Sequence, residues 1–343
     1  MSSQIHTSRR ANKRRARIYS GTERNLSFLA GRLRAGELVA VPTETVYGLA
    51  GNALDPRACA KIFRAKGRPS QDPLIVHIHS FAQLEQICEP NDAALRLASA
   101  LWPGALTLVL PKKPSVPDLV TSGRDSVAVR MPAHRLLRRL LKKAAVPLAG
   151  PSANPFGYIS PTSAEHVRQG LGGKINYILD GGASRIGLES TIVDLRDPQR
   201  PAILRPGAVT AEELERHLGR RLSRTKPANA ALSPKVGQVA PGLLARHYSP
   251  HTPLTLHRRL APAEHARSHP AEAFVYLQRP DGTLAPNIFW LDTRGELPGV
   301  ARQLFATLRK LDAMKFQRIH IQRAPDHGLG PAINDRLARA AAR

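Results

Sequence analysis

The sequence predicts an α/β protein with two domains, and three observations support this. Short apolar runs of strand length alternate with longer amphipathic runs of helix length over most of the 343 residues. The alternation fails at 223–239, where Pro, Ala, Ser, Asn, Lys and Thr dominate, and then resumes. The chain is long enough for two cores, and its apolar content of 42% is ordinary for a globular protein.

The first domain is expected at 22–222 and begins with a helix whose apolar face carries Leu26, Leu29 and Leu33. Gly36 ends this helix, and an apolar strand over 38–41 follows it. Further strands are expected at 74–78, 106–110, 126–129, 175–179, 190–195 and 202–204. Further helices are expected at 56–66, 91–101, 134–144 and after Thr210.

Residue types at three helix starts support these assignments. Pro56 suits a first helical turn, and Asn91 suits an N-cap. Thr210 is followed three positions later by Glu213, which is the spacing of a capping box.

A second, smaller α/β domain is expected at 251–343. Its elements are strands at 274–277, 288–291 and 318–321 and helices at 299–311 and 330–341. Residues 223–250 are predicted to be a linker, and the basic, acid-free residues 1–21 are predicted to be disordered.

Charge and composition narrow the function classes. The net charge of +25, from 51 basic and 26 acidic side chains, favours association with a polyanion, although free use of Arg by a GC-rich genome would also produce it. Aromatic residues are 5% and scattered, so no aromatic-rich RNA platform is predicted. No apolar run is long enough for a membrane span, and the N-terminus lacks the apolar region of a secretory signal. Its Arg-rich start has too poor an apolar face for a mitochondrial presequence.

The two cysteines, Cys59 and Cys88, do not have a metal-ligand spacing and are predicted to be free thiols in a reducing cytosol. We therefore expect a cytoplasmic protein without a bound structural metal.

The stretch 41–51 places two hydroxyls, a carboxylate and a phenol at the end of a buried strand. Open α/β sheets bind ligands at strand ends, so this turn is a candidate site. The alternative is a turn in which Thr43 and Thr45 only cap backbone groups. In either case Gly48 and Gly51 are predicted to close the turn.

Basic residues follow at two further points. Lys66 and Arg68 flank a glycine before a buried strand and suit a phosphate clamp, although a solvated basic turn is the alternative. Arg130 ends another strand, where its guanidinium suits a carboxylate. His77 either faces a ligand or is a half-buried histidine with its hydrogen bonds satisfied, and its strand alone favours the second.

The sequence contains no Ser-His-Asp elbow, no catalytic cysteine setting and no Walker A sequence. A cleft with hydroxyls and cations but no dedicated nucleophile or base suits the binding and positioning of anionic reactants. A nucleotide together with a small carboxylate fits this description.

The ordered motifs resemble those of the YrdC-type L-threonylcarbamoyladenylate synthases. The motifs of the first domain are Pro42-Thr43-Glu44-Thr45-Val46-Tyr47-Gly48-Leu49, Lys66-Gly67-Arg68-Pro69, Pro73-Leu74-Ile75-Val76-His77, Ala128-Val129-Arg130-Met131-Pro132, Pro151-Ser152-Ala153-Asn154, Ser190-Thr191-Ile192-Val193-Asp194 and Arg205-Pro206-Gly207. The two-domain form of the family is indicated by Pro241-Gly242, Arg246-His247-Tyr248-Ser249-Pro250, Gly328-Leu329-Gly330 and Ala332-Ile333-Asn334-Asp335-Arg336-Leu337. The resemblance covers residues 22–343.

The resemblance implies a twisted mixed sheet with helices around a large concave cleft, followed by a smaller Rossmann-like domain. It implies a nucleotidyltransferase that makes L-threonylcarbamoyladenylate from L-threonine, bicarbonate and ATP with release of pyrophosphate. The product would supply threonylcarbamoyladenosine modification of tRNA next to the anticodon, through downstream threonylcarbamoyl transferase machinery. Mg²⁺ would arrive with ATP. Together with the charge, this implies contact with tRNA or double-stranded RNA.

Site residues are implied by position. Threonine would be surrounded by Thr45, His77, Arg130, Gly150 and Ser190. ATP would be bound by Lys66, Arg68, Asp72, Ser126, Ser152, Ser160, Arg205 and Tyr248. Asp72 stands where the family more often has Asn, and a carboxylate beside a triphosphate repels it unless it holds magnesium or faces away.

Two other classes remain as alternatives. The first is an RNA-binding module that grips tRNA or double-stranded RNA electrostatically, which the charge supports but the clustered strand-end hydroxyls do not. The second is the carbamoyl transferase of hydrogenase maturation, which needs zinc-binding cysteine pairs that this chain lacks.

Overall fold

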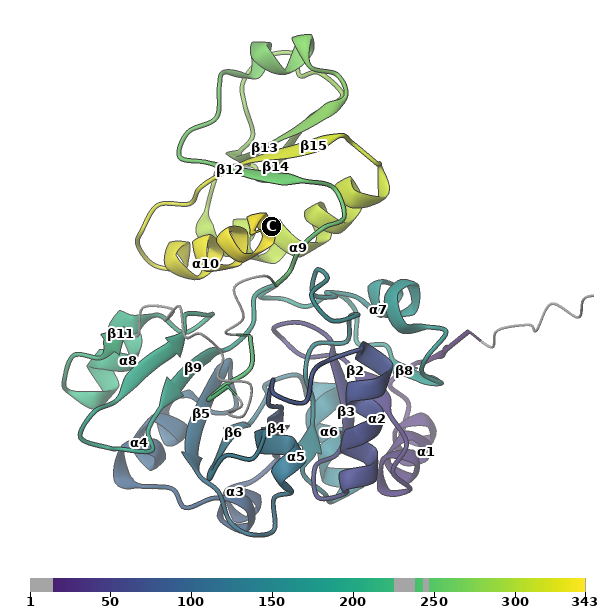
Figure 1. Ribbon diagram of the computed structural model, residues 1–343, viewed down its shortest axis with the longest axis vertical. Coiled ribbons are helices and arrows are strands. Elements are labelled where there is room, and N and C mark those ends of the chain that lie inside the picture. The colour runs from purple at the N-terminus through teal and green to yellow at the C-terminus, as the bar shows by residue number, and fades with distance from the viewer. Residues whose placement is uncertain (1–14, 225–237, 243–246, 343) are drawn as a thin grey trace, which may run out of the picture.

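The chain folds around two β-sheets in a computed structural model that describes residues 15–224, 238–242 and 247–342 (Figure 1). Within these residues the larger sheet is mixed and has eleven strands in the order β1-β8-β2-β3-β7-β4-β6-β5-β9-β10-β11. The smaller sheet is parallel, in the order β12-β15-β13-β14. We call residues 15–224 the first domain and residues 251–342 the second domain.

The strands of the first domain are β1 (Arg17–Tyr19), β2 (Val39–Val41), β3 (Gly48–Asn52), β4 (Ile75–His77), β5 (Leu106–Pro111), β6 (Ser126–Arg130), β7 (Leu148–Ala149), β8 (Tyr177–Leu179), β9 (Thr191–Asp194), β10 (Ala202–Arg205) and β11 (Ser223–Arg224). Its helices are α1 (Glu23–Arg34), α2 (Pro56–Lys66), α3 (Phe81–Ile87), α4 (Asp92–Leu101), α5 (Asp118–Thr121), α6 (Arg135–Ala144), α7 (Ala164–Leu171) and α8 (Ala211–Leu218). The second domain contains β12 (Leu254–His257), a 3₁₀ helix (Ala263–Ser268), β13 (Glu272–Gln278), β14 (Ile288–Asp292), α9 (Leu297–Ala313), β15 (Arg318–Gln322) and α10 (Gly330–Ala341).

Helices cover both faces of the larger sheet. Leu29 of α1 and Leu140 of α6 share a buried cluster with Val39 and Val41 of β2. Ala40, between these two valines, belongs to a cluster on the opposite face that also contains residues of α2, α4 and α8. The strand therefore has an apolar side chain on each face, as expected of a strand buried between helices. This confirms the predicted α/β fold class.

The local signals at helix starts are confirmed. Pro56 begins α2, the Asn91 side chain accepts a hydrogen bond from the Ala94 N–H, and the Thr210 side chain accepts one from the Glu213 N–H. Each cap satisfies a backbone donor that the helix itself leaves without a partner.

The prediction that Gly48 and Gly51 close a turn was wrong, because both lie in β3. A Cβ atom at Gly51 would lie 3.0 Å from Leu38 Cδ2 and 3.3 Å from Ile62 Cδ1. Gly51 therefore lets α2 and the residue before β2 pack closely against this strand. Pattern reading missed β3 because two of its five residues are glycines and its side chains do not alternate.

The second domain stacks on the first with α9 and α10 between the two sheets (Figure 1). Its core is continuous with Val46, Ile159 and Leu188 of the first domain. At Gly187, whose φ is +79°, an added Cβ would lie 2.5 Å from the Ala301 carbonyl oxygen of α9. The close approach of α9 at this point therefore requires glycine.

Three further expectations can be compared with the described residues. Cys59 and Cys88 are free, as predicted, and both are buried. No described helix has the length and apolar character to cross a bilayer. The predicted disorder of 1–21 was wrong at its end, because Arg17–Tyr19 form β1 and pair with β8. The predicted linker at 223–250 was wrong at its start, because Ser223–Arg224 form β11 and pair with β10. Both stay predictions for 1–14, 225–237 and 243–246, which lie outside the described residues.

Candidate active site

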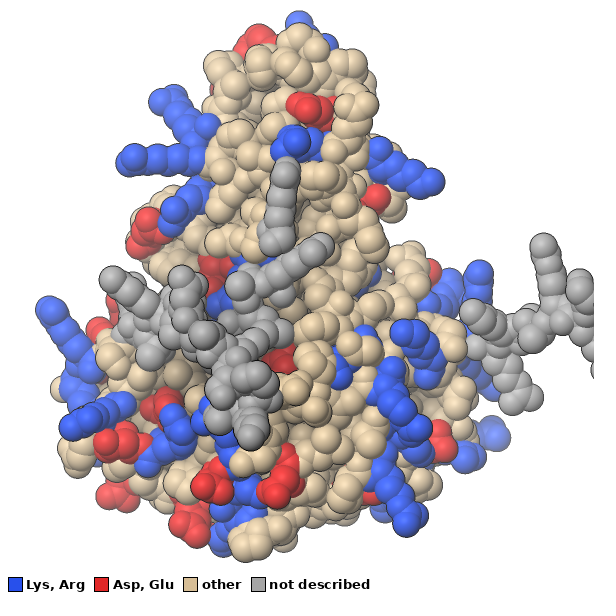
Figure 2. Space-filling view, viewed as in Figure 1, with Lys and Arg blue, Asp and Glu red and all other residues tan. Residues whose placement is uncertain are grey.

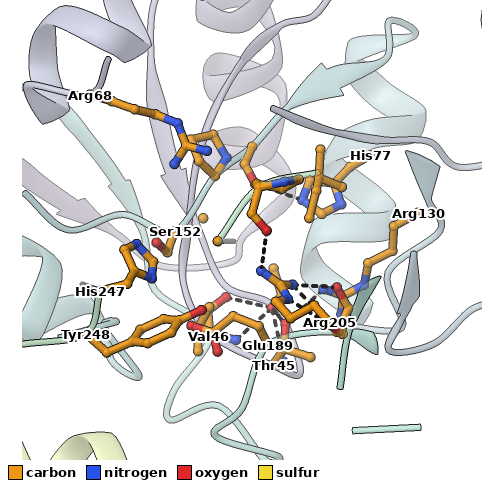
Figure 3. Close-up of a pocket in the computed structure, with 18 residues that line it drawn as sticks. Thr45, Val46, Arg68, His77, Arg130, Ser152, Glu189, Arg205, His247 and Tyr248 are labelled. Carbon is orange, nitrogen blue, oxygen red and sulfur yellow. Dashed lines mark hydrogen bonds between the residues drawn. The ribbon is translucent and has the colours of Figure 1, made fainter. Parts of the chain in front are cut away.

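A pocket lies where the loops after β2 and β7, the segment before β9, the ends of β4, β6 and β10 and residues 241–242 and 247–248 meet (Figure 3). Every residue predicted for threonine lies in its wall: Thr45, His77, Arg130, Gly150 and Ser190. Of the residues predicted for ATP, the wall contains Arg68, Ser152, Arg205 and Tyr248. The structure therefore brings together residues from strand ends that are far apart in sequence. Lys66, Asp72, Ser126 and Ser160 lie outside the wall that the described residues form.

The two hydroxyls of the first turn have different partners. Thr43 Oγ1 accepts hydrogen bonds from the backbone N–H groups of Thr45 and Val46, at 3.0 and 3.1 Å, and so caps the turn. Thr45 Oγ1 accepts a hydrogen bond from Arg130 Nη1 at 2.9 Å. Thr43 therefore caps the turn, but both residues line the pocket and their hydroxyls lie 2.7 Å apart.

Arg130 is held on three sides. Its Nε donates to the Gly104 carbonyl at 3.0 Å, its Nη1 to Thr45, and its Nη2 lies 2.6 Å from Glu44 Oε1. Burial raises the pKa of Glu44, but Arg130 and the Ala133 N–H lower it by more than burial raises it. The net shift is therefore downward, and the carboxylate is ionised. Glu44 thus fixes the guanidinium that the pocket presents. The sequence indicated this carboxylate but not its partner.

His77 and Arg130 lie side by side because β4 and β6 pair in parallel with these residues in register. His77 Nε2 lies 3.2 Å from the Gly150 carbonyl, and Nδ1 has no hydrogen-bond partner among the described residues. Burial, and then Arg130, lower the pKa of His77 to about 4, so the ring is neutral at neutral pH. A Cβ at Gly150 would lie 2.7 Å from His77 Cδ2, so glycine leaves room for this ring.

Ser190 and Arg205 form the next part of the wall. Ser190 Oγ hydrogen-bonds to Thr107 Oγ1 at 2.7 Å, across the parallel pair β5 and β9. Arg205 donates from Nη2 to the Ser190 carbonyl at 3.0 Å and from Nη1 to the Pro241 carbonyl at 3.3 Å. No acidic side chain of the described residues forms an ion pair with Arg205. Glu189 and Asp335 act favourably on its positive charge from a distance, but neither pairs with it directly.

Arg68 and Asp72 form a buried pair at one end of the pocket. Arg68 Nη2 lies 2.9 Å from Asp72 Oδ1, and the guanidinium also donates to the carbonyls of Asp72 and Pro73. Burial raises the pKa of Asp72, against the lowering effects of Arg68 and the Gly242 backbone N–H. Asp72 thus faces Arg68 and the stretch 238–242 rather than the pocket.

Lys66 does not present its ammonium group to the pocket. Its Nζ donates to the carbonyls of Ser152 and Asn154, each at 2.6 Å. Burial, and then Arg68, lower the pKa of Lys66 well below its usual value. Lys66 therefore holds the loop that carries Ser152, and the phosphate-clamp hypothesis has direct geometric support for Arg68 only.

Tyr248 closes the pocket from the chain segment before the second domain. It is fully buried, its ring stacks on Phe305 at 5.4 Å, and its backbone has a φ of +62°. Burial raises the pKa of its phenol to about 12, and the hydroxyl has no hydrogen-bond partner among the described residues. A buried hydroxyl in this state is available to a ligand.

Some wall residues were not predicted from the sequence. Glu189, Gly242 and His247 belong to the wall, and each stands within or beside a motif that the sequence showed. Burial, and then Arg68 and Lys66, hold the pKa of His247 well below its usual value, so this ring is neutral. Ser126 begins β6 outside the wall, and its hydroxyl has no partner among the described residues.

Family models match nearly the whole described chain. Residues 32–207 match the Sua5, YciO and YrdC family model, described as telomere recombination. Residues 209–342 match the model of a threonylcarbamoyl-AMP synthase C-terminal domain.

Curated relatives match over similar lengths. The chain is 42% identical to a threonylcarbamoyl-AMP synthase of Pyrococcus abyssi, covering 93% of this chain and 94% of that protein. It is 39% identical to a threonylcarbamoyl-AMP synthase of Bacillus subtilis, covering 94% of each. The crystal structure of P. abyssi Sua5 complexed with L-threonine superposes with a TM-score of 0.85 at 38% identity, covering 95% of this chain and 98% of that one.

Proposed function

Because this chain belongs to the family of threonylcarbamoyl-AMP synthases, which are nucleotidyltransferases, we propose that it forms L-threonylcarbamoyladenylate from L-threonine, bicarbonate and ATP and releases pyrophosphate. The observation that carries the proposal is the arrangement of three guanidinium groups in one pocket. Arg130 is fixed by Glu44, whereas Arg68 and Arg205 lie in other parts of the wall. Two anionic ligands, one small and one larger, suit this arrangement.

Threonine is assigned to the part of the wall around Arg130. The guanidinium would bind its carboxylate, with Thr45, His77, Gly150 and Ser190 around the rest of the molecule. Neutral His77 can accept or donate a hydrogen bond without adding charge next to Arg130. The P. abyssi relative crystallised with L-threonine supports threonine as the ligand.

ATP is assigned to the part of the wall around Arg68, Ser152, Arg205 and Tyr248. Arg205, which lacks an acidic partner among the described residues, would offset the charge of the phosphates. The other residues predicted for ATP would act from behind the wall. Lys66 holds the Ser152 loop, Ser160 bonds to Glu189, Asp72 pairs with Arg68, and Ser126 lies at the start of β6.

Magnesium is best assigned to the nucleotide. The described residues contain no group of three or more His, Cys, Asp or Glu side chains that suits a metal ion. The two acids close to the groups assigned to ATP already have partners, since Asp72 pairs with Arg68 and Glu189 pairs with Arg336. Bound to the triphosphate, Mg²⁺ would neutralise charge on the leaving pyrophosphate.

The chemistry then follows from positioning. The threonine amine attacks carbon dioxide, or bicarbonate with loss of water, to form a carbamate. A carbamate oxygen attacks the α-phosphorus in line, the bond to the β-phosphate oxygen breaks, and pyrophosphate leaves. The wall supplies cations and hydroxyls but no dedicated nucleophile. This suits a reaction in which the new N–C and O–P bonds both form between substrates.

We also propose that the product serves threonylcarbamoyladenosine modification of tRNA next to the anticodon, through a downstream transferase in the cytoplasm. The net charge of +25 supports contact with tRNA or double-stranded RNA. Lys and Arg side chains project from both domains in the view of Figure 2, with acidic side chains among them. The charge on this face does not define a single RNA-binding stripe.

Pyrophosphate release from ATP by the purified chain tests the function. We expect release with threonine, bicarbonate, ATP and Mg²⁺ together, and loss of release when either threonine or bicarbonate is omitted. A chain that releases no pyrophosphate under these conditions but binds tRNA tightly would contradict the enzyme and support the RNA-binding alternative.

A further inference from the structure

We propose that Arg336, on the last helix of the second domain, is a positioning residue of the nucleotide site because it neutralises Glu189 in the pocket wall. The second domain would thereby supply the positive charge that neutralises an acid in a site of the first domain. The inference rests on the proposed function in so far as the site binds ATP.

Arg336 reaches into the first domain without contact with solvent. Its Nε lies 2.7 Å from Glu189 Oε2, and the side chains are 0% and 8% exposed. Its Nη1 lies 2.7 Å from Asp335 Oδ2, and its guanidinium carbon lies 5.4 Å from the centre of the Tyr248 ring. Arg336 thus connects a carboxylate and an aromatic ring that both belong to the pocket wall.

Glu189 stands among the groups assigned to ATP. Its other oxygen, Oε1, accepts a hydrogen bond from Ser160 Oγ at 2.6 Å. Its neighbour Ser190 accepts hydrogen bonds from Arg205. In the view of Figure 3, Glu189 lies between Tyr248 and Arg205, beside Thr45. An ionised carboxylate at this position would repel the phosphates of a nucleotide unless a cation compensates it.

The source of that cation distinguishes Glu189 from the other buried acids near the pocket. Glu44 pairs with Arg130 and Asp72 pairs with Arg68, so both have partners within the first domain. Glu189 takes its ion-pair partner from the second domain. The charge of the wall therefore depends on how the two domains dock.

The docking contacts hold Arg336 in place. Gly187, two residues before Glu189, lies against the backbone of α9. Arg309 of α9 donates to the carbonyls of Ile159 and Ser160. The segment with Glu189 and the segment with its partner Ser160 are thus both packed against the second domain. This packing places Glu189 within contact distance of Arg336 on α10.

Binding of a non-hydrolysable ATP analogue to the full chain, measured by calorimetry, tests the inference. Arg336→Met should weaken binding by about 30-fold or more, the effect of leaving a desolvated charge unpaired. In the Glu189→Gln background the loss should disappear, because Gln needs no countercharge and still accepts from Ser160. The double variant Glu189→Gln/Arg336→Met should bind like Glu189→Gln.

Two controls separate this role from simple loss of folding. Arg323→Ala removes an exposed arginine of the same domain, which lies 3.4 Å from Asp326 and 47% exposed, and should leave analogue affinity unchanged. Threonine affinity should stay within about threefold in Arg336→Met, since the ion-pair and ring contacts of Arg336 are with Glu189, Asp335 and Tyr248 rather than with residues assigned to threonine. If Arg336→Met does not fold, the double variant still decides the question, since it contains no unpaired buried carboxylate.

The single and double variants distinguish charge compensation by Arg336 from a purely structural role. Recovery of analogue affinity in the double variant supports charge compensation by Arg336. Equal loss in Arg336→Met and in the double variant would show a structural role only and overturn the inference, as would unchanged affinity in Arg336→Met. A wild-type chain that binds no analogue would overturn the proposed function, and with it the premise of this inference.

Discussion

Thr43 and Thr45 stand two residues apart in one turn and have different roles. Thr43 caps the backbone, and Thr45 accepts a hydrogen bond from an arginine 85 residues away. The sequence predicted a polar turn correctly and left both roles open. It could not separate them, because the position of Arg130 depends on the pairing of β4 with β6 rather than on local spacing.

Glu44 and Lys66 also have roles that the sequence alone could not predict. The residue types of the cleft could be predicted, since cations and hydroxyls recur at strand ends. Whether a charged group faces the pocket or supports another residue depends on its partner. Glu44 fixes Arg130, and Lys66 bonds to two carbonyls of another loop. Such partners come from tertiary structure.

His77 gives a prediction about pH. Its pKa of about 4 in the folded chain lies below the ordinary value of 6.5, mainly because the ring is buried. Between pH 6.5 and 4 the unfolded chain therefore takes up a proton that the folded chain does not. The free energy of unfolding should fall as pH drops through this window, by about 3 kcal/mol from this group alone.

Urea unfolding of the wild type and of His77→Gln at several pH values from 7 to 4 measures this effect. Other buried histidines, such as His247, act in the same direction, so the difference between the two proteins isolates His77. The variant should lose less stability on acidification than the wild type. Parallel pH profiles would contradict the assignment.

At the scale of elements, the stretch 238–242 docks on the connection between α2 and β4. The Gln238 N–H donates to the Gln71 carbonyl at 2.9 Å, and the Pro241 carbonyl accepts from Arg205. The sequence singled out Asp72 as a departure from the family pattern. The structure places its carboxylate against Arg68 and the Gly242 N–H, where a negative charge is tolerated.

Gly242 gives the prediction for this element. Its φ is +77°, and an added Cβ would lie 2.9 Å from Arg205 Nη1 and 3.3 Å from the Tyr248 hydroxyl. Gly242→Ala should lower stability by about 1 kcal/mol through its backbone, and should also weaken ATP-analogue binding by displacing Arg205.

Gly282→Ala is the matched control, because Gly282 has the same φ of +77° and no atom within 4 Å of its added Cβ. Thermal unfolding should show a similar loss of stability in the two variants. Calorimetry should show weaker analogue binding in Gly242→Ala only. Equal affinities in the two variants would show that this stretch does not shape the nucleotide site.

At the scale of the molecule, the order of elements could be predicted from periodicity, caps and the unpatterned stretch after residue 222. Strong helices such as α2, α4 and α10 were predicted within a residue or so. Short or glycine-rich strands such as β1 and β3 were missed, because their pairing rather than their composition forms them.

The contact between the domains could not be predicted either. Gly187 and Arg336 both belong to ordinary-looking local sequence, and their roles depend on how α9 and α10 dock on the first domain. The tail motif containing Arg336 resembled the two-domain family form without indicating a role. The structure makes this tail part of the wall behind the pocket.

The central claim is that this pocket joins threonine, bicarbonate and the adenylate part of ATP. Mass spectrometry of the reaction with ¹³C-labelled bicarbonate tests it most directly. We expect an adenylate that contains both threonine and the labelled carbon, formed together with pyrophosphate. Formation of AMP, ADP or an unlabelled threonyl adenylate in its place would contradict the account.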